Sequence, residues 1–164
     1  MENVTLEQAV KLITDRIQPI EKTETVALMD SLGRILAEDI ISDMDNPPFD
    51  RAPIDGYACK SEDIADAEKD SPVKLKVVDE VCAGQFSEAV LRHGEAVRIM
   101  TGAAIPSGCD CCVWQENTDY GDSEVCIYKP CTELENYCFA GEDFKTGTKL
   151  IEKAVIFKFS TRLI

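Results

Sequence analysis

The chain has 164 residues, enough for one ordinary domain or two small ones, and hydrophobic residues make up 45% of it. That share supports a packed core and excludes a mainly disordered chain. With 31 acidic and 17 basic residues the net charge is −14, which repels phosphate backbones and anionic membranes, so we expect no binding to nucleic acid or to a membrane. The sequence shows neither a signal-peptide pattern nor an apolar run of the roughly 20 residues that a membrane span needs. The expected location is the cytoplasm.

Residues 5–17 predict an amphipathic helix. Thr5 and Gln8 have the spacing of a capping box at its start. Apolar residues recur at three- and four-residue steps and form one stripe: Leu6, Ala9, Val10, Ile13 and Ile17. That stripe packs either on its own domain or against a segment that this sequence does not contain, and the sequence leaves both alternatives open.

Short extended segments separated by turns are expected after this helix. They are residues 24–29, 35–41, 73–77, 95–100, 110–115, 124–129 and a last apolar run at 154–157. A helical turn is expected at 61–67, with Ser61 as its cap. Tyr120-Gly121-Asp122 separates two of the extended segments and predicts a hairpin. Many short strands at close spacing favour a small β-barrel-like lobe.

The run at residues 47–58 combines three prolines, an Asp-Gly step and two aromatic residues, a composition that excludes a helix. Glycine accepts a positive φ without a steric clash, so Asp-Gly indicates a turn. We therefore expect a stiff loop that presents Asp50 and Asp55 from a constrained backbone. Such a turn is also common surface architecture, so local chemistry alone does not assign it a function.

Further oxygen-bearing side chains lie on glycine-flanked turns: Thr101, Glu142 and Asp143. Hard oxygen ligands on loops suit Mg²⁺, which keeps several waters and shares substrate oxygens. Thr101 precedes Gly102, so its hydroxyl and the nearby amides could hold an oxyanion. The alternative is that these carboxylates only stabilise their own turns. The single histidine, His93, precedes a glycine and is expected to be a solvated loop residue instead of a catalytic base.

Eight cysteines invite a disulfide or metal interpretation. Only Cys109 and Cys112 have the Cys-x-x-Cys spacing, and no second such pair is present, so the two-pair zinc-ribbon pattern is missing. Stable disulfides are not expected without a secretory signal. We expect most of these thiols to pack as small hydrophobic side chains. A soft-metal thiolate protein is an alternative that rests on the cysteine count alone.

Three separated blocks resemble the MoeA / gephyrin E-domain family of molybdopterin molybdenumtransferases. They are Pro47-Pro48-Phe49-Asp50 with Asp55-Gly56-Tyr57-Ala58, then Arg98-Ile99-Met100-Thr101-Gly102-Ala103 continued by Val113-Trp114-Gln115-Glu116, and Gly141-Glu142-Asp143. Three blocks in one register are a specific match. The resemblance covers almost all 164 residues, but only the N-terminal part of the family's chain.

The resemblance implies an α+β, mainly β fold with an elongated shape. A β-barrel-like lobe at 44–143 is inserted into a discontinuous α/β lobe formed by 1–43 and 144–164. The family's pterin-binding domain and C-terminal domain are expected to be absent from this sequence. Family members act as homodimers, in the same pathway as a molybdopterin-adenylylating enzyme, and both are expected partners.

The resemblance also implies a reaction. Molybdate and adenylylated molybdopterin react with Mg²⁺ to give molybdenum cofactor and AMP. The implied catalytic residues are Asp55, Thr101 and Asp143, with Asp55 and Asp143 as the metal ligands. Asp50, Gly102 and Glu142 are the expected cofactor-binding residues.

The sequence departs from the family where an arginine is expected before Gly-Glu-Asp. Cys138 stands there, and residues 136–140 contain no cation. Either the site is weakened or a cation comes from elsewhere, such as Lys145. Because of this departure and the missing domains, a non-catalytic dimerisation or scaffolding module of the same fold is the alternative function. The 164 residues alone are expected to be inactive.

Overall fold

The computed structural model describes residues 4–158. The chain divides into two compact units: Met1–Ile40 together with Ile151–Ile164, of which residues 4–40 and 151–158 are described, and Ile41–Leu150. The predicted boundaries at residues 43/44 and 143/144 stay a prediction. Within the described residues, no helix has both the length and the apolar character that crossing a membrane requires.

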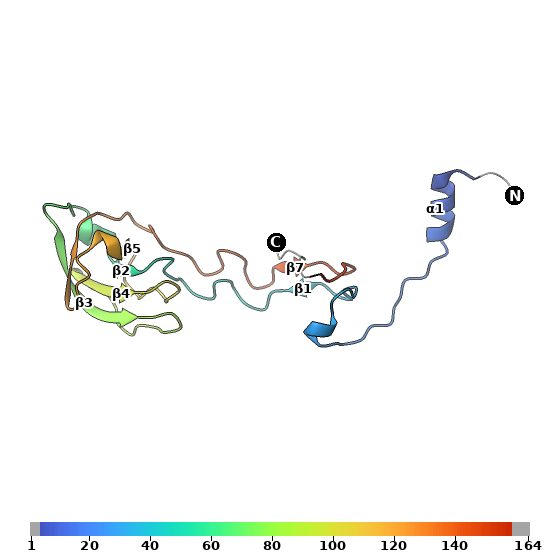
Figure 1. Cartoon of the computed structure of the whole chain (residues 1–164), viewed down its shortest axis with the longest axis horizontal. Helices are drawn as coiled ribbons and strands as arrows, with labels where there is room; N and C mark the ends of the chain where they lie inside the picture. The colour runs from blue at the N-terminus through green and yellow to red at the C-terminus, as the bar shows by residue number, and fades with distance from the viewer. Residues whose placement is uncertain (1–3, 159–164) are drawn as a thin grey trace. The chain divides into compact units, whose positions relative to one another are not determined.

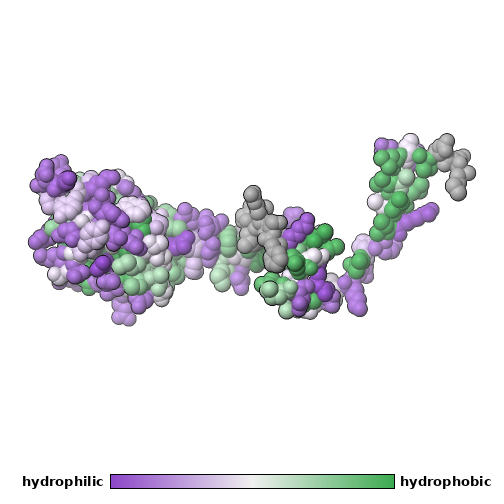
Figure 2. Space-filling model, in the orientation of Figure 1, coloured by the Kyte–Doolittle hydropathy of each residue, from purple (hydrophilic) through white to green (hydrophobic). Residues whose placement is uncertain are grey.

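The first unit contains helix α1 (Leu6–Thr14) and a short 3-10 helix, η1 (Leu28–Asp30). The predicted capping box is confirmed: the Gln8 amide donates to Thr5 Oγ1, and the Thr5 amide donates to Gln8 Oε1. None of the residues of α1 is buried, and Figure 2 shows apolar side chains gathered over this helix. The apolar stripe is thus not packed on its own domain within the described residues.

The predicted strand at residues 24–29 is wrong, because only η1 forms there. Extended backbone needs a partner to satisfy its amides and carbonyls. In this unit the pairing goes instead to Ile35, which bridges Ile156. The Leu36 amide donates to the Val155 carbonyl at 2.9 Å. The apolar run at 154–157 therefore contributes one bridge, and the last strand lies just before it.

The second unit is built on a five-stranded sheet of order β5-β2-β4-β3-β6. Its strands are β2 (Gly56–Cys59), β3 (Val73–Val81), β4 (Glu95–Ile99), β5 (Cys111–Trp114) and β6 (Glu124–Ile127). Strands β3 and β4 are parallel, and the other neighbours are antiparallel. Figure 1 shows the sheet curling on itself. With one α-helix and seven strands in the described residues, the expected α+β, mainly β class is confirmed.

Strands β2 and β5 have buried side chains on both faces. In β2, Tyr57 and Cys59 belong to one core cluster, and Ala58 between them belongs to another. In β5, Cys111 and Cys112 divide between the two clusters in the same way. Successive side chains of a strand point to opposite faces, so each face of the sheet carries a core. This explains why these strands are apolar throughout instead of alternating.

Two segments connect this sheet with a small two-stranded sheet of β1 (Ile40–Ile41) and β7 (Lys149–Ile151). Figure 1 shows the two segments, at residues 42–50 and 138–148, running side by side. Asn46 bridges Phe144, and the Ser42 amide donates to the Thr148 carbonyl at 2.9 Å. This pairing brings the 47–58 loop next to Gly141-Glu142-Asp143 although they are far apart in the sequence.

Two local predictions are wrong in part. The expected segments 110–115 and 124–129 do not pair with each other, because β5 pairs with β2 at one edge of the sheet and β6 pairs with β3 at the other. The chain does fold back at Gly121, but over a shorter stretch, in which Thr118 bridges Ile127. A 3-10 helix, η3 (Gln115–Asn117), leads the chain from the first edge towards the second. The 3-10 helix η2 (Ser61–Ile64) forms as expected, but its N-cap is Lys60. Ser61 instead donates from its amide and its hydroxyl to the carboxylate of Asp110, at 2.6 and 3.0 Å.

Candidate functional site

Asp55 and Thr101 meet at one end of the sheet. Asp55 directly precedes β2 and Thr101 follows β4 within two residues, and because these strands are antiparallel, with Gly56 opposite Ile99, the start of one lies beside the end of the other. Asp55 Oδ1 accepts hydrogen bonds from the Thr101 amide and the Thr101 hydroxyl, both at 2.7 Å. These two hydrogen bonds hold the pKa of the Asp55 carboxyl below its usual range, and the bond from the amide has the larger effect. Asp55 is therefore ionised at neutral pH.

The turn after Thr101 fixes this geometry. Gly102 has φ 83°, and its amide donates to the Ala52 carbonyl at 2.8 Å. A Cβ at position 102 would meet only Ala83 Cβ, at 3.8 Å. The glycine is therefore needed for its left-handed backbone and not for space.

The last residues of β3 lie at this same end of the sheet, because β3 runs parallel to β4. The Met100 amide donates to the carbonyl of Val81, the last residue of β3, at 3.1 Å. In the loop that follows, Phe86 packs edge-on against Phe49 with ring centroids 5.0 Å apart. Phe86 is 67% exposed. The Asp55–Thr101 pair thus lies at the same end of the sheet as a loop that carries a solvent-facing aromatic ring.

Asp50 lies in a different environment. Its Oδ2 accepts from the Tyr137 hydroxyl at 2.7 Å, and its Oδ1 accepts from the Ala140 amide at 2.8 Å. Burial raises the pKa of the Tyr137 phenol most strongly, and the hydrogen bond to Asp50 raises it further. Both oxygens of Asp50 therefore have protein partners, and the carboxylate joins the 47–58 loop to the segment before Gly141.

Glu142 and Asp143 are exposed on the neighbouring turn. Glu142 Oε2 accepts from the Phe139 amide at 3.1 Å. Asp143 Oδ2 accepts from Asn46 Nδ2 at 2.9 Å, and the Asp143 amide donates to the Asn46 carbonyl at 2.9 Å. These contacts fix the turn against the loop that carries Asp50.

Sequence reasoning missed Arg51 as a member of this group. Its amide donates to the Cys138 carbonyl at 2.9 Å, and the Cys138 amide donates back at 3.1 Å. The guanidinium also interacts with the Cys138 thiol. The cation beside Cys138 is thus Arg51, whereas the expected candidate, Lys145, lies near Asp45 and Gly141. One signal could have identified it: Arg51 is the only basic residue of the 47–58 run.

The predicted site residues form two groups. Asp55, Thr101 and Gly102 are one group, and Asp50, Glu142 and Asp143 are the other, around Arg51 and Cys138. No cluster of three or more His, Cys, Asp or Glu side chains in residues 4–158 is arranged to hold a metal. The fold therefore forms no protein-only cage for a cation there. Mg²⁺ does not require one, because it is held by one or two carboxylates together with water and substrate oxygens.

The cysteines pack largely as expected. Cys59, Cys111, Cys112 and Cys131 are buried, Cys82 is exposed, and the remaining three are partly buried; all are free thiols. Burial raises the pKa of Cys109 to about 12, so that thiol is neutral at physiological pH.

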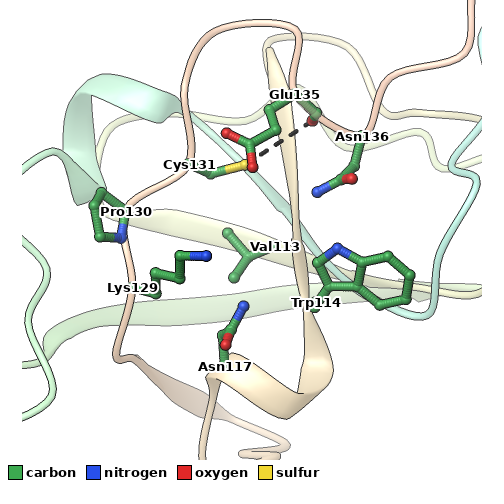
Figure 3. Close-up of a pocket in the computed structure, with 8 residues that line it drawn as sticks. All are labelled: Val113, Trp114, Asn117, Lys129, Pro130, Cys131, Glu135 and Asn136. Carbon is green, nitrogen blue, oxygen red and sulfur yellow. Dashed lines mark hydrogen bonds between the residues drawn. The ribbon is translucent and has the colours of Figure 1, made fainter.

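A pocket on the second unit contains none of the predicted site residues (Figure 3). Cys131 lines it and donates to the Glu135 carbonyl. The complete lining is Val113, Trp114, Asn117, Lys129, Pro130, Cys131, Glu135 and Asn136.

The MoeA N-terminal region (domain I and II) is the family whose model matches this chain, over residues 4–160. The molybdopterin molybdenumtransferase of Staphylococcus epidermidis is 37% identical over 152 residues, which cover 93% of this chain and 36% of that protein. The protein of the same name from Staphylococcus aureus is 39% identical over 153 residues, with the same coverage. This chain thus spans about 36% of the length of these curated relatives.

Solved structures agree with this match. A crystal structure of the molybdopterin biosynthesis MoeA protein from Pyrococcus horikoshii superposes with a TM-score of 0.88 at 37% identity, over 96% of this chain and 42% of that one. A second structure of the MoeA protein from that organism gives 0.82 at 38% identity, over 98% and 41%. Sequence and fold lead to one conclusion: this chain belongs to the MoeA family and corresponds to its N-terminal region.

Proposed function

We propose that this chain acts in molybdenum cofactor biosynthesis as the N-terminal part of a molybdopterin molybdenumtransferase. The observation that carries the proposal is the Asp55–Thr101 pair, with both hydrogen bonds at 2.7 Å, in a chain of this family. The proposed reaction joins molybdate to adenylylated molybdopterin and releases AMP. The remaining contacts to the pterin come from the part of the relatives' length that this chain does not span.

The electrostatics of Asp55 suggest its role. A carboxylate whose pKa is held below its usual range is a weak proton acceptor at neutral pH. It remains charged, which suits a ligand of a cation or an acceptor that orients a hydroxyl. In the proposed mechanism Asp55 fixes the Thr101 hydroxyl through Oδ1, and Oδ2 faces the reacting groups.

Magnesium would be shared between this chain and the substrate. Asp55 and Asp143 would hold it, together with water and phosphate oxygens. When bound, the cation would neutralise charge on the phosphate that leaves as AMP. Since molybdate is an oxyanion, carboxylates alone would repel it, and a cation between them removes that repulsion. The expected partners are a second copy of the protein and the enzyme that supplies adenylylated molybdopterin.

The proposal is tested with a chimera. Residues 1–164 of this chain are joined to the C-terminal part of the S. aureus relative that lies beyond its match. The chimera is expressed in a bacterium that lacks its own molybdenumtransferase, and a molybdenum-dependent enzyme is assayed. We expect activity to return with the chimera and to disappear with Asp55→Asn.

The matched control is Asp122→Asn. Asp122 is an exposed carboxylate that pairs with Arg98 at 3.1 Å, on a turn outside the site, so this change should leave the activity intact. Equal activity of the Asp55 and Asp122 variants would favour the scaffolding alternative. A soluble chimera that restores nothing, where the S. aureus protein does, would contradict the proposed function.

A further inference from the structure

Arg51 is held in place by two neighbouring segments. Its backbone exchanges two hydrogen bonds with Cys138, and it also bridges Ala104. The next residue, Ala52, accepts the Gly102 amide at 2.8 Å. Arg51 therefore lies between the Cys138 segment and the turn that follows Thr101, next to both groups of predicted site residues.

The pairing with Cys138 also sets the direction of the side chains. Two residues that exchange both amide–carbonyl bonds are directly opposite in an antiparallel ladder. Side chains of directly opposite residues lie on the same face. The guanidinium of Arg51 and the thiol of Cys138 therefore point to one side, and the charges of Asp143 and Glu142 also act on Arg51.

The guanidinium is not neutralised by a close carboxylate. Within the described chain, Arg34 and Arg98 each form an ion pair within 4.0 Å, but Arg51 forms none. The Cys138 thiol, first, and the charges of Asp143 and Glu142, more weakly, raise the pKa of Arg51. Its Nε is buried without a hydrogen-bond partner. Arg51 is only partly buried as a residue and a guanidinium carries five N–H groups, so donors other than Nε are left for another acceptor.

Cys138 keeps this capacity available. The interaction with Glu142 raises the pKa of the Cys138 thiol most strongly, and burial raises it further. The thiol is thus neutral at pH 7 and adds no negative charge beside Arg51. An aspartate or glutamate at position 138 would have closed an ion pair with the guanidinium and used up its donors.

We propose that Arg51 is an oxyanion-binding residue, which takes a tetrahedral oxyanion of the substrate through its guanidinium fork. The shared chemistry is that of molybdate and of a phosphoryl group, both of which match the planar fork of arginine. The inference rests on the proposed function for the identity of the substrate. Its direct test does not require molybdenum transfer.

The direct test uses Cys138 as a reporter in the 164-residue chain. Alkylation rates are measured residue by residue by mass spectrometry, with anionic iodoacetate and with neutral iodoacetamide. An accessible cation attracts the anionic reagent, so it raises the ratio of the iodoacetate rate to the iodoacetamide rate at the neighbouring thiol. We expect Arg51→Met to lower this ratio at Cys138 several-fold and to leave it unchanged at exposed Cys82. Arg92→Met, which removes an exposed arginine elsewhere in the second unit, should change neither ratio.

The same experiment reports whether the variant is folded. Cys59 and Cys112 are buried, so their rapid alkylation would show that Arg51→Met has unfolded the chain. Arg51→Lys then replaces it, because lysine keeps the charge and loses the fork. The outcome that overturns the proposal is a Cys138 ratio that does not change in folded Arg51→Met.

Protection identifies the oxyanion. Molybdate and AMP are added separately, and the iodoacetamide rate at Cys138 is compared with that at Cys82. Slowing by molybdate alone assigns the free oxyanion to Arg51, and slowing by AMP assigns the phosphoryl group. Slowing by neither overturns the proposal. In folded Arg51→Lys, loss of the protection is the expected result.

A second arm uses the chimera, once it is active. Arg51→Met should raise the KM about tenfold, the loss expected for a charged hydrogen bond. The affected KM is that for molybdate if molybdate protects, and that for adenylylated molybdopterin if AMP protects. Adding Cys138→Arg to that variant should recover most of it, since the two side chains share a face. Recovery distinguishes anion binding from a general structural role. If the chimera is inactive, the proposed function fails while the alkylation result still stands or falls by itself.

Discussion

Gly56→Ala should destabilise the second unit strongly, although the change adds one methyl group. A Cβ at position 56 would lie 1.8 Å from the Val113 carbonyl oxygen and 2.9 Å from its carbon. Non-bonded contact needs roughly 3.5 Å, so β5 would have to move by about 1.7 Å. That movement breaks the β2–β5 ladder, including the bond from the Gln115 amide to the Asp55 carbonyl at 3.1 Å. Overpacking and the lost hydrogen bonds together cost about 3 kcal/mol.

The expected signature is a lower unfolding temperature. For a unit of about this size 1 kcal/mol corresponds to roughly 4 °C, so the midpoint should fall by about 12 °C. The only tryptophan, Trp114, lies opposite Gly56 in the ladder and reports the transition by fluorescence. Gly84→Ala is the matched control: a Cβ there meets nothing within 4 Å, but φ is 82°. It should cost about 1 kcal/mol from backbone strain alone. Equal midpoints for the two variants would refute the steric argument.

Two further predictions concern hydrogen bonds at the site. Because the pKa of Asp55 is lowered in the folded chain, its bonds to Thr101 stabilise the fold at pH values above the pKa of the unfolded chain, about 3.9. This stabilisation is lost as the pH falls through the pKa of the folded chain. NMR titration of Asp55 should show its pKa rising towards that value in Thr101→Val, and an unchanged pKa would contradict the assignment. Tyr137→Phe should cost about 1–2 kcal/mol in urea unfolding, because it removes a hydrogen bond to the charged Asp50. A urea midpoint equal to that of the unmodified chain would contradict the stabilising role of the Tyr137–Asp50 hydrogen bond.

Features with local causes were predictable from the sequence. The capping box of Thr5, the strands β3 and β4 and the turn after Thr101 follow from spacing, alternation and glycine, and all three form. The burial of cysteines on both faces of the sheet also agrees with their packing as small apolar side chains.

Features with non-local causes were not predictable. The predicted pairing of 110–115 with 124–129 failed because strand partners are chosen by the whole sheet, and β5 and β6 lie at opposite edges, which leaves only the Thr118–Ile127 bridge across the turn. The Asp55–Thr101 contact depends on the antiparallel register of β2 and β4. The pairing of Arg51 with Cys138 joins segments that are far apart in the chain, so no spacing rule indicates it.

AMP release from adenylylated molybdopterin shows whether Asp55 serves molybdenum transfer. This chain is mixed with the separately produced C-terminal part of a relative, adenylylated molybdopterin, molybdate and Mg²⁺. We predict AMP release in the mixture and not from this chain alone, with a loss of about a hundredfold or more in Asp55→Asn, the range seen when an electrostatic group of an active site is removed. Asp122→Asn should release AMP at the unmodified rate. If the Asp55 and Asp122 variants release AMP equally fast, Asp55 does not serve molybdenum transfer.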